Sequence, residues 1–175
     1  MSVASGYSTA GASRREILSS VAKSAAFGLG AASFVSVSDA QALEMCPPKA
    51  NSCVRTTWTP PSGTSNSDIA AALRDAIQAY PQEGQGDVDG GGWTIASDDL
   101  SGSGSARVEF KSSGKGTFAK IFNGGKPFVD DLKLEINDGK VEVKSQSRVG
   151  DSDFGVNKKR VDYLAALLSA KGWSV

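Results

Sequence analysis

The stretch LKLEINDGKVEV, residues 132–143, alternates apolar and polar side chains on both sides of an Asn-Asp-Gly sequence. Alternation with a period of two is typical of β-strands that bury one face. The Asp138-Gly139 pair supplies the positive φ angles that a tight turn between antiparallel strands requires. These residues therefore predict an antiparallel β-hairpin, around which the other elements can be placed.

Further strand-like runs precede this hairpin, and sequences such as Ser101-Gly102-Ser103-Gly104 and Asn123-Gly124-Gly125 separate them. The runs are rich in β-branched and aromatic residues, which favour strands, and the separators suit tight reversals. The predicted strands, including the two of the hairpin, are residues 93–97, 106–111, 117–122, 128–136 and 140–147.

Two segments repeat apolar residues at helical spacing. The first follows Ser67-Asp68, a good N-cap pair, and stops at Pro81, whereas Gly172 ends the second. The apolar positions are Ile69, Leu73, Ala76, Ile77 and Tyr80 in the first helix and Val161, Leu164, Leu167 and Leu168 in the last. This order predicts an α+β fold: a single antiparallel sheet of about five strands, with an N-terminal and a C-terminal helix packed on one face.

The composition excludes several classes of function. The chain has 175 residues, with 19 Lys and Arg, 19 Asp and Glu, and no His. This balance lacks the basic surface that a phosphate backbone requires, so nucleic acid is not an expected partner. Without histidine, imidazole-based triads and most zinc sites are excluded. Catalysis would use carboxylates, lysines, hydroxyls or the two thiols, and we expect neither a cofactor nor a bound metal.

The start of the chain carries the pattern of an export signal. Ser13-Arg14-Arg15-Glu16-Ile17-Leu18 resembles a twin-arginine motif, and Ala40-Gln41-Ala42 has the small-x-small pattern of a cleavage site. The stretch 17–37 between them is too polar for a transmembrane helix. The alternative interpretation is an ordinary amphipathic helix with a chance Arg pair.

This signal predicts the domain organisation and the compartment. Residues 1–42 are expected to be a cleavable leader, 43–66 a cysteine loop and linker, and 67–175 the α+β domain, with no transmembrane span in the mature chain. Twin-arginine routes lead to thylakoid lumens and bacterial periplasms. The Ser-, Ala- and Gly-rich, acid-free opening at 1–12 resembles part of a plastid transit sequence, so we expect the chloroplast thylakoid lumen, with the periplasm as the alternative.

The two cysteines, Cys46 and Cys53, enclose a loop that contains two prolines. Disulfides persist in both of these compartments, so we expect a bridge that staples the mature N-terminus. A redox-active pair is the alternative, although the spacing differs from the Cys-x-x-Cys of thioredoxin-like sites. Two cysteines without a histidine cannot close a structural zinc site.

The densest cluster of Gly, hydroxyl and charged residues is the run 145–161, which reads SQSRVGDSDFGVNKKRV. With the Phe-Val-Asp-Asp run at 128–131 and the opening Cys46-Pro47, Asn51 and Cys53-Val54, it resembles the uncharacterised domain of unknown function 1499 family of bacteria and photosynthetic eukaryotes. The resemblance covers essentially the whole mature domain. Two departures are Lys144, where the family pattern more often has Arg, and Ser52, which separates Asn51 from Cys53. The resemblance implies little about function, because the family has no established activity.

The run at 145–160 has two interpretations. In the structural one, Arg148 pairs with Asp130 or Asp131, and Asp153 or Asn157 caps the last helix. In the functional one, a helix N-terminus and nearby arginines bind a carboxylate, a phosphate or a lipid headgroup. The candidate binding residues are Ser145, Ser147, Arg148, Gly150, Asp153, Asn157 and Arg160.

Three functions remain, in order of preference. The first is a non-catalytic accessory or assembly protein of the thylakoid lumen, associated with a photosynthetic membrane complex of the photosystem type. The second is a small-ligand or anion-binding domain that uses residues 147–160. The third is a carboxylate-based enzyme with Asp130, Asp131 and Asp153. Adjacent residues on a strand point to opposite faces, so Asp130 and Asp131 do not readily serve one site, and the enzyme is the least favoured reading.

Overall fold

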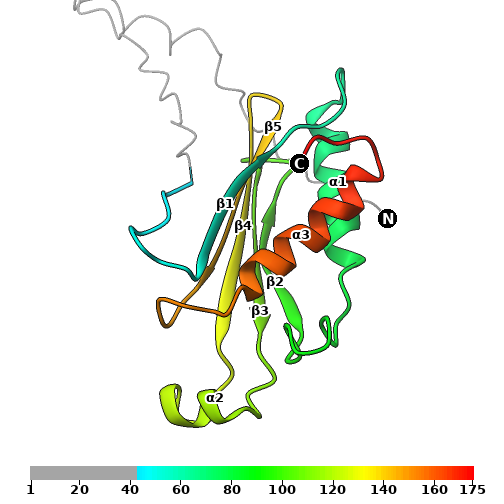
Figure 1. The fold of residues 1–175 in the computed structure, drawn as a ribbon. Coiled ribbons are helices and arrows are strands. Elements are labelled where there is room, and N and C mark those ends of the chain that lie inside the picture. The colour runs from blue at the N-terminus through cyan, green and yellow to red at the C-terminus, as the bar shows by residue number, and fades with distance from the viewer. Residues whose placement is uncertain (1–42) are drawn as a thin grey trace, which may run out of the picture. The chain divides into compact units, whose positions relative to one another are not determined.

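The computed structural model describes residues 43–175, which form a five-stranded sheet and three helices (Figure 1). The predicted leader, residues 1–42, lies outside the described residues. No helix in the described part is long and apolar enough to cross a membrane. The elements in chain order are β1 (Cys53–Trp58), α1 (Asn66–Gln78), β2 (Trp93–Asp99), β3 (Ser105–Lys111), α2 (Thr117–Phe122), β4 (Val129–Asn137), β5 (Lys140–Ser147) and α3 (Val156–Ser169).

The strands lie in the order β1-β5-β4-β3-β2, and every neighbouring pair is antiparallel. The predicted hairpin is at the centre, where β4 pairs with β5 up to Asn137 opposite Lys140. Asp138 (φ 48°) and Gly139 (φ 70°) form the turn, as a two-residue loop with positive φ angles requires. The prediction of an α+β fold with a single antiparallel sheet is confirmed.

One predicted strand is wrong. Residues 117–122 form the short helix α2 instead. β3 and β4 pair directly as far as Lys111 opposite Val129, so the chain between them leaves the sheet and has no strand to pair with. A six-residue apolar run does not distinguish a strand from a helical turn, because both periods fit it equally well.

The remaining strand, β1, lies within residues 43–66, which the sequence predicts to be a cysteine loop and linker. It pairs with β5, from Cys53 opposite Gln146 to Trp58 opposite Val141. Val54, Thr56 and Trp58 share one face of this strand by alternation, and Trp58 is almost fully buried. The alternation of β1 is short, and the Pro, Ser and Thr residues around it are typical of a linker. Its partner strand, β5, lies far along the chain, so the sequence alone does not predict the pairing.

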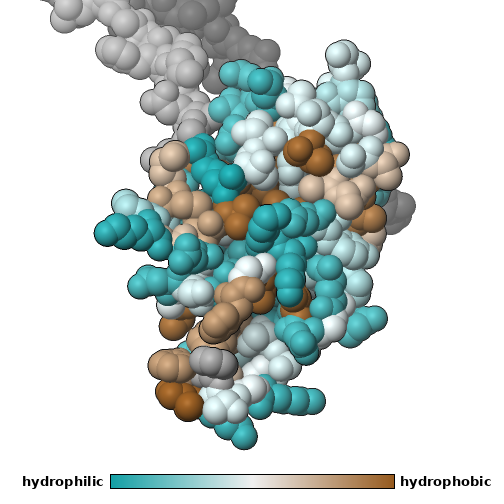
Figure 2. Space-filling view, viewed as in Figure 1, coloured by the Kyte–Doolittle hydropathy of each residue, from teal (hydrophilic) through white to brown (hydrophobic). Residues whose placement is uncertain are grey.

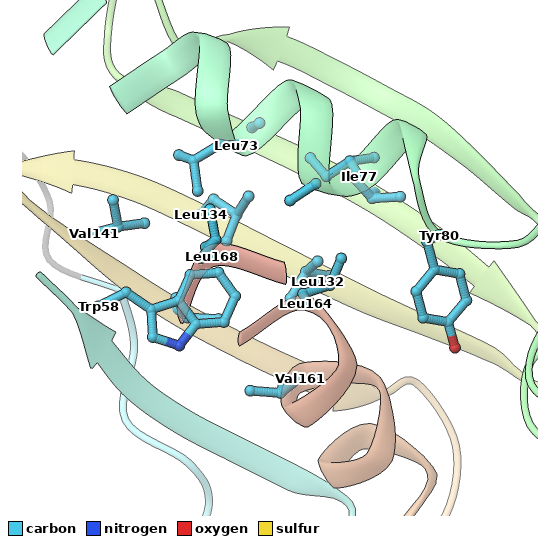
Figure 3. Close-up of a cluster of buried hydrophobic side chains, with 14 of the residues drawn as sticks. Trp58, Leu73, Ile77, Tyr80, Leu132, Leu134, Val141, Val161, Leu164 and Leu168 are labelled. Carbon is cyan, nitrogen blue, oxygen red and sulfur yellow. The ribbon is translucent and has the colours of Figure 1, made fainter. Parts of the chain in front are cut away.

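The core joins the sheet to α1 and α3. Figure 3 shows Leu73 and Ile77 of α1, with Leu164 and Leu168 of α3, around the strand residues Leu132 and Leu134. Residues two apart on a strand share a face, which is why alternate strand residues are buried. The side chains of this cluster belong to residues between 58 and 173, so a chain that begins at Leu43 contains the whole of this core.

Candidate functional site

Three segments that are far apart in the sequence meet at the end of the sheet where β5 stops and β4 begins. The Asn51 N–H donates to the Asp151 carbonyl at 2.8 Å, and the Ser52 hydroxyl donates to the Gly150 carbonyl at 2.9 Å. The Arg148 N–H donates to the Val129 carbonyl at 3.0 Å. The cysteine loop, the start of β4 and the run at 145–160 therefore form one structural unit.

The predicted disulfide between Cys46 and Cys53 is present. It closes the loop that carries Asn51 and Ser52 next to the sheet. Just before the disulfide, Glu44 accepts a hydrogen bond from Lys144 of β5, and the Met45 sulfur accepts one from Arg55 of β1.

Arg160 of α3 is fully buried, and all of its donors are used. Its Nε donates to Asp89 Oδ2 at 2.9 Å, and its Nη2 donates to Asp130 Oδ2 at 2.8 Å. Its Nη1 donates to Ser145 Oγ at 2.9 Å. Further bonds reach Asp89 Oδ1 and Asn157 Oδ1. A guanidinium has five N–H donors, so none remains for a ligand.

Two carboxylates keep this buried guanidinium charged. Burial alone would lower the pKa of Arg160, but hydrogen bonds and charges from Asp89 and Asp130 outweigh it and raise that pKa. The guanidinium carbon also lies 4.4 Å from the centroid of the Phe110 ring, a favourable cation–π distance. Burial, followed by the hydrogen bond to Asp89, raises the pKa of Tyr80.

Asp89 is a residue that the sequence analysis missed. It lies in the glycine-rich segment between α1 and β2, yet it is almost fully buried and adopts a φ of 58°. No periodicity marks the position, and its partner Arg160 is 71 residues away. Nothing in the sequence pattern identifies it.

Asn157 organises the N-terminal end of α3. Its Oδ1 accepts from Ser145, and its Nδ2 donates to Ser147 Oγ at 3.0 Å and to the Ser52 carbonyl at 3.1 Å. Asp153 accepts from the N–H groups of Gly155 and Asn157 at 2.9 and 2.6 Å, which satisfies donors at the helix start. Ser145, Ser147, Asp153 and Asn157 are thus bonded to one another and to the fold.

Arg148 lies on the opposite face of the sheet. Its Nε donates to Asp131 Oδ2 at 2.8 Å, and Nη2 reaches both Asp131 and Glu109. Hydrogen bonds from Arg148 hold the pKa of Asp131 below its usual value. Of the two pairings considered, Arg148 makes the one with Asp131, whereas Asp130 pairs with Arg160.

The structure therefore brings most of the predicted site residues into one buried hydrogen-bond network and separates Arg148 from it. Ser145, Ser147, Asn157 and Arg160 lie on the core side of the sheet, and Arg148 lies on the other side. Gly150 forms a turn with a φ of 85°. The carboxylates of the enzyme hypothesis are also apart, since Asp130 binds Arg160, Asp131 binds Arg148 and Asp153 caps α3.

A row of four basic residues crosses the face that carries Arg148, here called the polar face. Arg55, Lys144, Lys133 and Arg107 are directly paired neighbours on β1, β5, β4 and β3. Like charges directly opposite each other destabilise a sheet. The outer two have carboxylate partners, because Arg55 lies 3.2 Å from Glu142 and Arg107 lies 3.1 Å from Asp131.

The two central lysines share a single, exposed carboxylate. Lys144 Nζ lies 3.4 Å from Glu44 Oε2, and Lys133 Nζ lies 4.0 Å from the same atom. The Lys144 side chain is only 5% exposed, whereas that of Glu44 is 79% exposed. An ammonium has three donors, and within residues 43–175 the Lys144 ammonium has one hydrogen bond, to Glu44.

A pocket of about 220 Å³ opens on the polar face at this lysine pair. Its lining has three cationic side chains against two carboxylates, which leaves one net positive charge. The lining residues are Glu44, Asp131, Lys133, Lys144, Gln146, Ser147 and Arg148. We define these residues as the lysine-pair pocket.

Lys133, Gln146 and Glu44 are absent from the predicted site residues, and Lys144 enters the prediction only as a departure from the family pattern. A usable signal did exist. A two-residue turn at Asp138-Gly139 places Lys133 opposite Lys144 by simple counting. Two lysines that face each other destabilise a sheet, and an anion between them relieves the repulsion.

Comparison with known families agrees with the motifs. The profile of the family described as protein of unknown function (DUF1499) matches residues 33–168, which is more than half of the chain. This match confirms the family expected from the cysteine opening, the start of β4 and the run at 145–161. No curated protein matches the sequence.

Replacing Arg160 by Met tests the buried network. Arg160→Met leaves Asp89 and Asp130 buried without a cation, so we expect the free energy of unfolding to fall by about 3–5 kcal/mol. Urea denaturation measures this change. Lys159→Met, at an exposed neighbouring position, is the control and should change stability by less than about 0.5 kcal/mol. Equal effects of the two variants would contradict the structural role of Arg160.

Arg148→Gln tests the ion pair on the polar face through its pH dependence. Because the pKa of Asp131 is lowered in the folded state, the pair stabilises the fold above the unfolded carboxyl pKa of about 4. That contribution is lost as the pH falls through the lowered pKa. At pH 7, the free energy of unfolding of the wild type should exceed that of the variant by about 0.5–1 kcal/mol. This difference should shrink below pH 4. Urea titrations across this range would contradict the pairing if the difference stayed constant.

Proposed function

The chain belongs to the DUF1499 family of proteins of unknown function, and we propose that this member is a non-catalytic binding protein for a small anion. The proposed ligand group is a carboxylate or a phosphate, bound in the lysine-pair pocket. The observation that carries the proposal is the pair Lys133 and Lys144, which face each other and, among residues 43–175, share only the exposed Glu44 carboxylate.

The position of the pocket supports access from solvent. We infer that α1 and α3 cover one face of the sheet, because their buried side chains share a core with Leu132 and Leu134. Lys133 alternates with these two residues and points the other way. As far as residues 43–175 are concerned, the polar face is then open apart from the chain segment that carries Glu44.

The energetics of Lys144 favour an anionic ligand. Taking an ammonium out of water is costly unless hydrogen bonds and opposite charge compensate it. Glu44 supplies one acceptor from an exposed position, so an external anion that replaces it would gain two ammonium partners. In this scheme, the Glu44 carboxylate occupies the place of the ligand and competes with it.

The lining also limits the class of ligand. A volume of about 220 Å³ is below the range of about 300–1,000 Å³ that is usual for drug-sized molecules. Gln146 adds a neutral hydrogen-bonding side chain, and Arg148 adds a planar cation at the rim. A compact anion with one or two charged groups fits these features better than a nucleotide.

We further propose that the protein acts in the thylakoid lumen as an accessory or assembly factor for a photosynthetic membrane complex, with the bacterial periplasm as the alternative compartment. The leader motif supports export. The Leu43 N–H donates to the Glu135 carboxylate, so cleavage after Ala42 would bring a new ammonium group to a carboxylate.

N-terminal sequencing of the protein recovered from its native compartment tests this processing. A chain that begins at Leu43 is expected. A mature protein that retains residues 13–42 would contradict the leader, and recovery of the processed protein from the periplasm of a bacterium would decide against the lumen.

Calorimetric titration with phosphate, succinate and citrate tests the pocket. Lys144→Met should abolish binding and leave stability unchanged or raised, because a buried ion is replaced by an apolar side chain of similar length. Glu44→Gln should bind the anion more tightly than the wild type, because it removes the competing carboxylate. Thermal denaturation should show a matching ligand-dependent stabilisation.

The control is Lys140→Gln, on the same strand but exposed in the turn, which should bind as the wild type does. If Glu44→Gln weakened binding, or if Lys140→Gln abolished it, the pocket would not be the anion site.

A further inference from the structure

The connection between β3 and β4 is basic throughout. Residues 111–128, which are the last residue of β3 and the chain from there to β4, are here called the α2 connection; they contain four lysines, and no Asp or Glu occurs from 110 to 129. Residues 43–175 carry 16 of the basic and 17 of the acidic residues of the chain. The α2 connection therefore has a charge of +4, whereas the rest of this domain has a charge of −5. The four lysines are Lys111, Lys115, Lys120 and Lys126.

Within the part of the chain that the structure describes, these lysines form no ion pair with a carboxylate. Lys115, Lys120 and Lys126 are exposed. Within residues 43–175, the lysines that form salt bridges are Lys133, Lys144, Lys158 and Lys171. The positive charge of the α2 connection is thus available to a partner.

Two large apolar side chains are exposed on the same connection. Ile121 and Phe122, consecutive in α2, are each 66% exposed. Figure 2 shows hydrophobic residues beside hydrophilic ones at the lower end of the molecule, where Figure 1 places α2. Lysines combined with exposed aromatic and aliphatic residues are typical of segments that lie in a lipid–water interface.

The α2 connection is an ordered feature with a defined base. The Ser112 N–H donates to the Phe128 carbonyl at 3.0 Å, which closes the base of the connection. The Asn123 side chain donates to the Lys126 and Pro127 carbonyls at 3.1 and 2.9 Å, which folds the chain after α2. The exposed residues are therefore held away from the core at one end of the sheet.

We propose that the α2 connection docks this domain on an anionic lipid bilayer. The lysine ammonium groups lie at the headgroup phosphates, and Ile121 and Phe122 enter the boundary of the acyl chains. Charge complementarity selects the lipid, because anionic surfaces attract each nearby lysine. The negative charge of the rest of the domain turns this end, and no other, toward the membrane.

Vesicle sedimentation of the chain that begins at Leu43 tests the proposal. The vesicles contain either phosphatidylcholine alone or phosphatidylcholine with about 30% phosphatidylglycerol, an anionic fraction that gives the surface the negative potential such binding needs. The wild type should bind the anionic vesicles and not the neutral ones. The triple variant Lys115→Gln, Lys120→Gln, Lys126→Gln should lower the partition coefficient at least about ten-fold.

The matched control removes three exposed lysines elsewhere, with Lys49→Gln, Lys140→Gln and Lys159→Gln. It changes the net charge equally and should retain binding. Ile121→Ser with Phe122→Ser should weaken the binding that persists at high salt. Equal losses in both lysine triples, or equal binding to neutral vesicles, would overturn the proposal.

A fluorescent label distinguishes insertion from loose attraction. The described residues contain no free cysteine, so Ile121→Cys carries an environment-sensitive dye at one defined site. Its emission should shift to the blue on anionic vesicles, whereas a dye at Lys140→Cys should not respond. If the dye responded only to native membranes, and if this response were lost when their proteins were removed, the partner would be a protein. That result would overturn the proposal of docking on lipid.

Discussion

The buried guanidinium of Arg160 is the interaction on which the rest of the structure depends. A charge without contact with water must have every donor bonded, and Arg160 meets this need only when four segments are in place. These are α3, the start of β4, the end of β5 and the loop that carries Asp89. The run that resembled an anion-binding segment is therefore occupied by the fold itself, with Asp89 and Asp130 as its anions.

Strand alternation then decides where ligand chemistry remains. Asp130 and Ser145 point toward Arg160, so their neighbours Asp131 and Lys144 point to the polar face. On that face the outer cations of the basic row have carboxylate partners, whereas the central lysines have only Glu44 among the described residues. The same sheet thus holds one fully satisfied charge network and one that is incomplete, and the second is the better candidate for binding.

Local patterns predicted much of this fold, and long-range pairings limited the rest. The hairpin follows from alternation, and the apolar faces of α1 and α3 follow from helical spacing. The disulfide follows from two cysteines around a short loop with two prolines in a chain expected to be exported. β1 was missed because its partner β5 is distant, and α2 was mistaken for a strand because six apolar-rich residues fit both periods. Asp89 has no local signal, whereas the Lys133 and Lys144 pair follows from the register that the Asp-Gly turn imposes.

A crystal structure of the chain from Leu43 onward, grown with selenate and measured at the selenium edge, tests the central claim most directly. Selenate resembles a small oxyanion and marks its own position by anomalous scattering. The account predicts an anomalous peak within hydrogen-bond distance of the Lys133 and Lys144 ammonium groups, with the Glu44 side chain displaced. A peak at Arg160 or at the N-terminus of α3, and none at the lysine pair, would contradict it.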